Sequence, residues 1–248
     1  MGLATANRIS GGVEVITDLR ALRRALESGV TIEKVVCPAG RPYVPALYQL
    51  IRRYQLRVQQ VPLSALPEGA TWGAAYVSPL PFRRVDELLS GPVEGLLVAL
   101  VGITDVRNVG AIVRNAVAFE VRGLLWPTEK VTAPSNPEIW RSSAGTLPKI
   151  PIFRTARLYT DLQRLAETGW SLIATTKPSP RAIPLSEWRW PPAAILLLGS
   201  EDKGLPEAYL SLAPIHLTIP HASTVESLNA GSAASILLWH HYQQQRAL

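Results

Sequence analysis

The chain has 248 residues, of which 47% are hydrophobic, enough for one large domain or two modest ones. No apolar run reaches the roughly 18 residues needed to cross a bilayer, and the first residues lack the apolar core of a secretion signal. The single cysteine, Cys37, excludes an internal disulfide and a metal site built from cysteines. We therefore expect a soluble, cytoplasmic protein.

The formal net charge is +6 and the sequence pI is about 9.7. Residues 1–90 hold 11 Lys and Arg against 7 Asp and Glu, whereas residues 91–248 hold 14 against 12. A basic balance favours an anionic partner, most commonly a nucleic acid. Three arginine clusters in the first part could contact phosphates or could simply be solvated helix faces: Arg20/Arg23/Arg24, Arg52/Arg53/Arg57 and Arg83/Arg84.

The first part of the chain alternates helix-like and strand-like segments. Leu19, Leu22 and Leu26 share one face of a helix that Thr17 can cap. A second helix and three short strands are expected at 45–54 and at 32–37, 56–61 and 74–77. This pattern predicts a small α/β domain at 1–80.

Three prolines, a basic pair and a Ser-Gly-Pro break lie between Ser78 and Pro92, which suits an interdomain connection at 81–94. From Gly95 onward the pattern repeats strand then helix. Near-continuous apolar strands such as 194–198 predict a parallel sheet covered on both faces, in a domain at 95–248. Strands are expected at 96–101, 123–126, 150–153, 171–175, 194–198 and 216–219, and helices at 109–119, 137–143, 158–167 and 227–244.

The segment 105–119 follows a predicted strand and opens a predicted helix. Asn108 is placed to cap this helix, and Gly110 and Ala111 keep its first turns slim. An arginine near a helix start does not favour the helix dipole, so Arg114 suggests a phosphate or carboxylate partner. The alternative is an ordinary cap followed by a surface arginine.

The segment 195–205 follows the most apolar strand of the chain. Gly199 and Gly204 permit close backbone approach or positive φ angles. Glu201 suits a cleft better than a core, although a glycine-rich turn with solvated charges would explain the same residues.

The segment 219–235 leads from a strand into the last helix. Ser227 and Asn229 flank the start of this helix, and the small residues that follow permit close packing, which is also the structural alternative. The histidines are not spaced like metal ligands, so we expect no metal and place these residues in loops and on helix surfaces: His216, His221, His240 and His241.

In this order and spacing, the three segments resemble the signature motifs of the SpoU (TrmH-like) RNA ribose 2′-O-methyltransferases. The resemblance covers 95–248 and implies an α/β sheet of the SPOUT type, threaded into a deep trefoil knot. Residues 1–80 resemble, more weakly, the small α/β RNA-binding domain of the ribosomal RNA members. This architecture resembles the bacterial 23S rRNA guanosine 2′-O-methyltransferases, so it implies a guanosine of 23S rRNA, as naked RNA or in a ribosomal particle.

The resemblance also implies a methyl donor, a site and an assembly. The donor would be S-adenosylmethionine, bound by backbone groups at four positions: Thr175, Gly199, Ile219 and Leu228. The polar motif residues expected to serve catalysis are Arg114, Asn108, Glu201, Ser227 and Asn229. The family implies a homodimer with active sites near the subunit interface, to which the last helix contributes.

Arg114 matches the arginine central to catalysis in the family. Its guanidinium normally stays protonated, so we expect it to hold a phosphate beside the reacting hydroxyl rather than to act as a base. The sequence departs from the family pattern at Val106, Asn115, Glu120, Asp202, Lys203, His221 and Gly231.

Two other functions fit the same residues. A transfer RNA ribose methyltransferase would use the same motifs, and comparing isolated RNAs as methyl acceptors would separate it. A non-catalytic RNA-binding or ribosome assembly factor could retain the fold, and it would be distinguished by failing to bind the donor.

Overall fold

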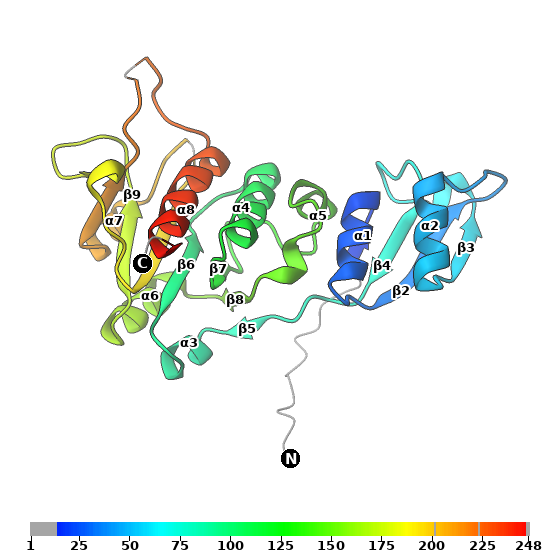
Figure 1. The fold of residues 1–248 in the computed structure, drawn as a ribbon, viewed down its shortest axis with the longest axis horizontal. Helices are drawn as coiled ribbons and strands as arrows, with labels where there is room; N and C mark the ends of the chain where they lie inside the picture. The colour runs from blue at the N-terminus through cyan, green and yellow to red at the C-terminus, as the bar shows by residue number, and fades with distance from the viewer. Residues whose placement is uncertain (1–13, 201, 223, 247–248) are drawn as a thin grey trace.

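The structure is a computed structural model of the chain and describes residues 14–200, 202–222 and 224–246. Figure 1 shows the N-terminal elements as a small lobe at the right and the later elements as a larger lobe at the left. Helices α1 (Leu19–Glu27) and α5 (Pro137–Ser142) are in contact where the lobes meet. None of the described helices combines the length and the hydropathy needed to cross a membrane.

The N-terminal lobe is built on a four-stranded mixed sheet in the order β1-β4-β2-β3. The pair β2–β3 is parallel, and the other two pairs are antiparallel. Helix α2 (Pro45–Tyr54) has the predicted bounds, and Leu22 of α1 and Leu47 of α2 are fully buried. The strands are β1 (Glu14–Ile16), β2 (Ile32–Pro38), β3 (Val58–Val61) and β4 (Ala74–Val77).

The cap of α1 differs from the prediction. Asp18, not Thr17, is the N-cap, and its carboxylate accepts a hydrogen bond from Ala21 N at 2.9 Å. Thr17 is buried, and its carbonyl oxygen accepts a hydrogen bond from Trp72 Nε1 at 2.7 Å. The predicted Thr17 cap is therefore wrong, because tertiary contacts use this residue.

The larger lobe is built on an eight-stranded sheet in the order β10-β12-β9-β11-β6-β7-β8-β5. Every neighbouring pair is parallel, which confirms the predicted parallel α/β sheet. The strands are β5 (Arg83–Arg84), β6 (Gly95–Leu100), β7 (Gly123–Pro127), β8 (Ile152–Thr155), β9 (Ser171–Thr175), β10 (Ile183–Pro184), β11 (Ala193–Leu198) and β12 (Ile215–Thr218).

Two elements lie in the segment 81–94, which the sequence analysis treats as a connection. Strand β5 pairs with β8 at one edge of the large sheet, and α3 (Asp86–Ser90) follows it. Val85 and Leu88 are buried in the same core as α6 (Leu158–Glu167). The segment thus packs as part of the large sheet layer.

Alternating side chains of the central strands fill the two faces of the large sheet. On β6, Leu96 and Val98 face the core shared with α4 (Val106–Ala118) and α8 (Ala230–Arg246), whereas Leu97 and Ala99 face the core of α6. The latter face also carries α7 (Glu207–Leu212), which the sequence analysis did not predict. Short 3₁₀ turns complete the chain: η1 (Leu63–Ala65), η2 (Leu147–Lys149) and η3 (Leu185–Glu187).

Candidate methyltransferase site

A pocket of about 260 Å³ lies where β9, β11 and β12 end. The residues that follow these three strands form its walls, together with the loop before α8 and the first turns of α8. Parallel strands present their carboxyl ends at one edge of a sheet, which is where ligands gather in such folds. The position of the pocket follows from the topology.

All four residues predicted to bind the donor line this pocket: Thr175, Gly199, Ile219 and Leu228. Ser227, predicted as catalytic, lines it as well. The hydroxyl of Thr175 donates to the carbonyl oxygen of Leu197 at 2.9 Å, so it is committed to the neighbouring strand. Segments far apart in the sequence therefore meet at one small cavity.

The loop between Gly199 and Gly204 closes tightly on itself. A Cβ atom on Gly199 would lie 2.6 Å from the oxygen of Gly204 and from the nitrogen of Leu205, so this position has no room for a side chain. Gly204 has a φ of +63° and donates from its nitrogen to the carbonyl oxygen of Ser200 at 2.8 Å. Both glycines thus have the roles expected from sequence, while Glu201 lies outside the described residues.

The rim of the pocket carries polar contacts between its loops. Lys177, which follows β9, lies 2.6 Å from Glu226 in the loop before α8. This ion pair holds the pKa of the Glu226 carboxyl below its usual value, chiefly through the hydrogen bond from Lys177. The ring of His221 donates from Nδ1 to the carbonyl oxygen of Ile219 at 2.8 Å. The first contact links two loops at the pocket mouth, whereas the second lies within the segment that follows β12.

Asn108 does not cap α4, contrary to the prediction. Asp105 is the N-cap and accepts from Arg107 N at 2.8 Å, so α4 begins three residues earlier than expected. Asn108 lies inside the helix and is only 7% exposed, and its Oδ1 accepts from Asn229 Nδ2 at 2.8 Å. The first and third motifs are thus joined directly.

Asn229 also fixes the start of α8. Its Oδ1 accepts hydrogen bonds from Gly231 N at 3.0 Å and from Ser232 N at 3.3 Å. The helix begins at Ala230 rather than at Ser227, because the residues before it form the pocket loop. Asn229 therefore ties this loop to α4.

Helices α4 and α8 make a second polar contact two turns further along α4. Asn115 Nδ2 donates to Ser235 Oγ at 2.6 Å and to the carbonyl oxygen of Gly231 at 3.3 Å. A Cβ on Gly231 would lie 2.9 Å from the Cβ of Ala111, so the helices approach closely here. In the sequence Asn115 stands out only as a departure from the family pattern, and spacing alone could not have revealed its partner.

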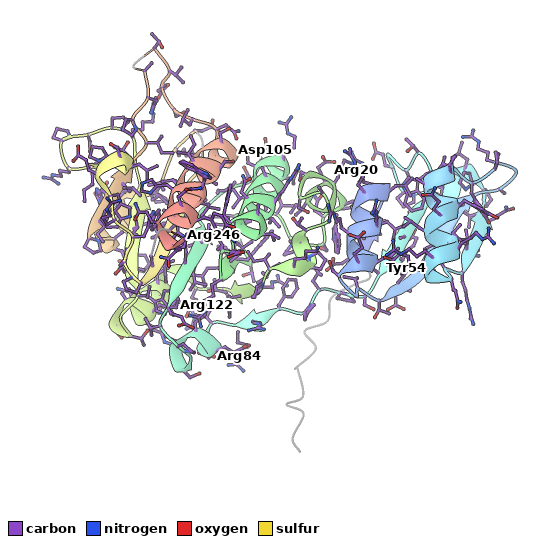
Figure 2. The ribbon with its side chains drawn as sticks, in the orientation of Figure 1. Arg20, Tyr54, Arg84, Asp105, Arg122 and Arg246 are labelled. Carbon is purple, nitrogen blue, oxygen red and sulfur yellow. The ribbon has the colours of Figure 1, made fainter. Side chains whose placement is uncertain are left out.

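Arg114 lies on the exposed side of α4 and is not among the residues that line the pocket. Within the described residues its guanidinium makes no hydrogen bond or ion pair. By contrast, Asp105 at the start of the helix, labelled in Figure 2, pairs with Arg107, whose hydrogen bonds lower the pKa of the Asp105 carboxyl. Arg114 thus offers its charge to solvent or to a binding partner.

Sequence reasoning missed the apolar wall of the pocket. Leu205, Leu210 and Leu237 line it from the loop after β11, from α7 and from α8. Their only sequence signal is hydrophobicity, which core residues share. Among the described residues, no group of three or more His, Cys, Asp or Glu side chains is arranged to hold a metal ion.

Comparison with known proteins shows which family this site belongs to. Residues 95–239 match the model of the SpoU rRNA Methylase family. The chain belongs to this family. A SpoU relative from Mycobacterium leprae, described as an uncharacterised tRNA/rRNA methyltransferase, is 32% identical over 247 residues, which are 98% of this chain and 72% of the relative.

A second tRNA/rRNA methyltransferase relative, from Mycolicibacterium paratuberculosis, is 35% identical over 176 residues. The match covers 70% of this chain and 56% of the relative. The chain thus spans little more than half the length of this relative.

Solved structures share the fold across nearly the whole chain. The SpoU methyltransferase AviRb from Streptomyces viridochromogenes, in complex with the cofactor AdoMet, superposes with a TM-score of 0.76 at 22% identity, covering 96% of this chain and 92% of AviRb. An AdoMet-bound rRNA methyltransferase from Sinorhizobium meliloti gives 0.73 at 21% identity, covering 93% and 87%. The two-lobed architecture is therefore that of known SpoU methyltransferases.

Proposed function

We propose that the protein transfers a methyl group from S-adenosylmethionine to a ribose 2′-hydroxyl of RNA. The observation that carries this proposal is the pocket at the ends of β9, β11 and β12, where all four expected donor-binding residues meet. Family membership supports it, as do the names of the relatives and the AdoMet complexes of AviRb and the Sinorhizobium meliloti enzyme.

The lining of the pocket fits this donor. Leucines form an apolar wall suited to the adenosine, and loop backbone at the strand ends supplies polar groups. We infer that the trefoil knot of the family surrounds this pocket.

The reaction would form a bond between the donor methyl carbon and the 2′-oxygen and break the bond between that carbon and the donor sulfur. S-adenosylhomocysteine would be the leaving group, and the hydroxyl proton would pass to solvent. Bound S-adenosylmethionine supplies an electrophilic methyl group on sulfur. The pocket loops hold that group in line with the hydroxyl, and such positioning accounts for much of the rate in a bimolecular transfer. Ser227 and Leu228 contribute to this alignment, because Asn229 anchors their loop to α4.

Arg114 holds a phosphate next to the reacting ribose in this proposal. Its exposed position and its lack of a partner among the described residues support that role, because guanidinium binds phosphate in a bidentate manner. Arg114→Lys keeps the charge but loses the planar fork, so kcat/KM for RNA should fall by roughly tenfold or more. Unchanged turnover of the lysine variant would exclude this role.

The N-terminal domain at 1–80 binds the RNA substrate in this proposal. A groove of about 390 Å³ in this lobe is lined by Tyr54, Lys34 and Arg57, and Figure 2 labels Tyr54 at the end of α2. Aromatic rings stack on bases and cations neutralise phosphates, which is the usual combination in single-strand binding. The specific substrate, a guanosine of 23S rRNA, rests on the resemblance of the two-domain architecture.

A homodimer completes the proposal. Ile236 and Trp239 lie three residues apart on α8 and are 38% and 51% exposed. Large exposed apolar side chains on one helix face are typical of an interface, and a second copy of the chain is the expected occupant.

The decisive experiment is transfer of labelled methyl from S-adenosylmethionine to total RNA and to ribosomal particles, followed by nucleoside analysis. A 2′-O-methylated nucleoside that depends on Arg114, tested with Arg114→Ala, is the expected product. Its location in large ribosomal RNA or in transfer RNA would separate these two substrates. No transfer, together with no donor binding by calorimetry, would instead favour the non-catalytic RNA-binding factor.

A further inference from the structure

The two lobes meet at a buried carboxyl group, Glu14 on β1. Glu14 is 2% exposed, and each of its carboxyl oxygens receives one hydrogen bond from a different part of the chain. Oε1 accepts from Leu80 N at 3.1 Å, and Oε2 accepts from Trp140 Nε1 on α5 at 3.0 Å. One side chain therefore links the small sheet, the connecting segment and a helix of the large lobe.

Burying this group is costly. Desolvation raises the pKa of the Glu14 carboxyl, and no cation pairs with it among the described residues. A buried donor left without an acceptor destabilises the folded state, and removing the carboxyl would leave two such donors in the junction. An apolar residue would seal the same space but could not fix the direction of either donor.

Further contacts surround Glu14 and keep the junction closed. Arg141 donates from Nη2 to Thr17 Oγ1 at 3.3 Å, across the same boundary. Gly145, in the loop after α5, has a φ of +72°, and a Cβ there would lie 2.7 Å from the backbone of Ala21 on α1. The small lobe therefore packs against α5 and the loop after it without space for intervening side chains at this point.

From α5 a series of direct contacts leads to the pocket. A Cβ on Gly110 of α4 would collide with Ser142 of α5. Ser142 Oγ lies 3.2 Å from the carbonyl oxygen of Val106, while its shortest hydrogen bond, at 2.7 Å, is to the carbonyl oxygen of Glu138 within α5. Helix α4 then meets the pocket loop through the bond between Asn108 and Asn229. The junction and the pocket are thus connected through two helices in direct contact.

We propose that Glu14 is a positioning residue that holds the small lobe in one orientation against α5 and so sets where bound RNA enters the site. This inference rests on the proposed function, because it requires the small lobe to carry RNA. Glu14 touches neither donor nor RNA in this scheme, so its loss should affect RNA use and leave the donor pocket intact.

Three variants of the full chain test the role. Trp140→Phe removes the indole donor across the junction, and Glu14→Gln places an amide NH₂ against one of the two donors. Trp72→Phe is the matched control, because it removes a buried indole bond, to Thr17 O, that lies within the small lobe. The measurements are kcat and KM for RNA, donor affinity by calorimetry and the largest dimension of the protein by small-angle scattering.

Trp140→Phe and Glu14→Gln should lower kcat/KM for RNA by roughly tenfold or more while donor affinity changes by less than about twofold. They should also increase the largest dimension, whereas Trp72→Phe should match the wild type in all three measurements. If Trp140→Phe and Trp72→Phe lowered kcat/KM for RNA equally, the Glu14 contact would only contribute to stability, and the proposal would be overturned. If the wild type methylates no RNA, the proposed function fails, and unchanged scattering by Trp140→Phe and Glu14→Gln would separately overturn the junction role.

Discussion

Asn229 serves two helices with one side chain. Its oxygen caps α8, and its nitrogen donates to Asn108 on α4. Asn229→Ala should lower the free energy of unfolding by about 1–2 kcal/mol, because it removes both the cap and the interhelical bond. Chemical denaturation measures this loss.

Asn229→Ser separates the two contributions. The serine oxygen can cap the helix but cannot reach Asn108 as the amide does, so we expect stability to recover in part. Donor affinity should be lower than that of the wild type in both variants, because each loses the bond that ties the pocket loop to α4. Donor affinity equal to that of the wild type would show that the interhelical bond does not shape the pocket loop.

His241 makes the protein sensitive to acid. The sequence analysis placed it on a helix surface, which is wrong: it is 6% exposed and its ring packs edge-on against Trp190 at 5.3 Å between centroids. The reason is that His241 continues the face of α8 on which Leu237 and Leu238 are buried. Burial lowers the pKa of His241 to about 4.

Because the folded-state pKa of His241 lies below its unfolded value, its neutral form favours the folded state. This contribution is complete above about pH 6.5 and is lost as the pH falls toward about 4, at a cost of at most about 3 kcal/mol. Urea unfolding at several pH values should show this decline, and His241→Phe should reduce its slope. If the unfolding free energy of the wild type and of His241→Phe depended on pH in the same way, His241 would not be the source of the decline.

At the scale of elements, the distance between α4 and α8 is set by small residues. Gly231 faces Ala111 at a separation that leaves no room for another methyl group. Gly231→Ala should therefore lower the free energy of unfolding by about 1 kcal/mol, since overpacking outweighs the gain in helix propensity. The melting temperature and the unfolding midpoint measure the change.

The double variant Gly231→Ala/Ala111→Gly provides the control. Exchanging the two residues restores the space between the helices. The double variant should therefore lose less unfolding free energy than the two single variants lose in total, and the difference is the coupling energy. Strict additivity would show that the helices have room to move apart.

Most helices and strands could be predicted because periodicity reports burial directly. Helix α2 and strands β4 and β9 have the expected bounds, and the residues expected at the donor site share one pocket. Polar contacts between distant segments could not be predicted in this way. The roles of Glu14, Asn115 and Thr17 depend on partners 55 to 126 residues away, and no local pattern encodes such distances.

At the scale of the whole molecule, the expected dimer predicts that a charge on the exposed face of α8 prevents association of the subunits. Trp239→Glu places a charge on the exposed face of α8 without disturbing the core, because Trp239 is half-exposed in one copy. A charge buried at an interface is costly, so we expect the variant to be a monomer in light scattering and the wild type to be a dimer. Trp239→Phe should stay dimeric. If Trp239→Glu were also a dimer, the interface would not include this face of α8.

The position of strand β5 determines where a fragment that contains only the large lobe should begin. The family match begins at residue 95, yet the edge of β8 is covered by Arg83 and Arg84, which come earlier. A fragment cut at Gly95 would expose the backbone of β8, and an unprotected edge of this kind invites strand addition and aggregation. Expression of the catalytic half alone should thus yield soluble material when it starts near Pro81 and precipitate when it starts at the boundary suggested by homology.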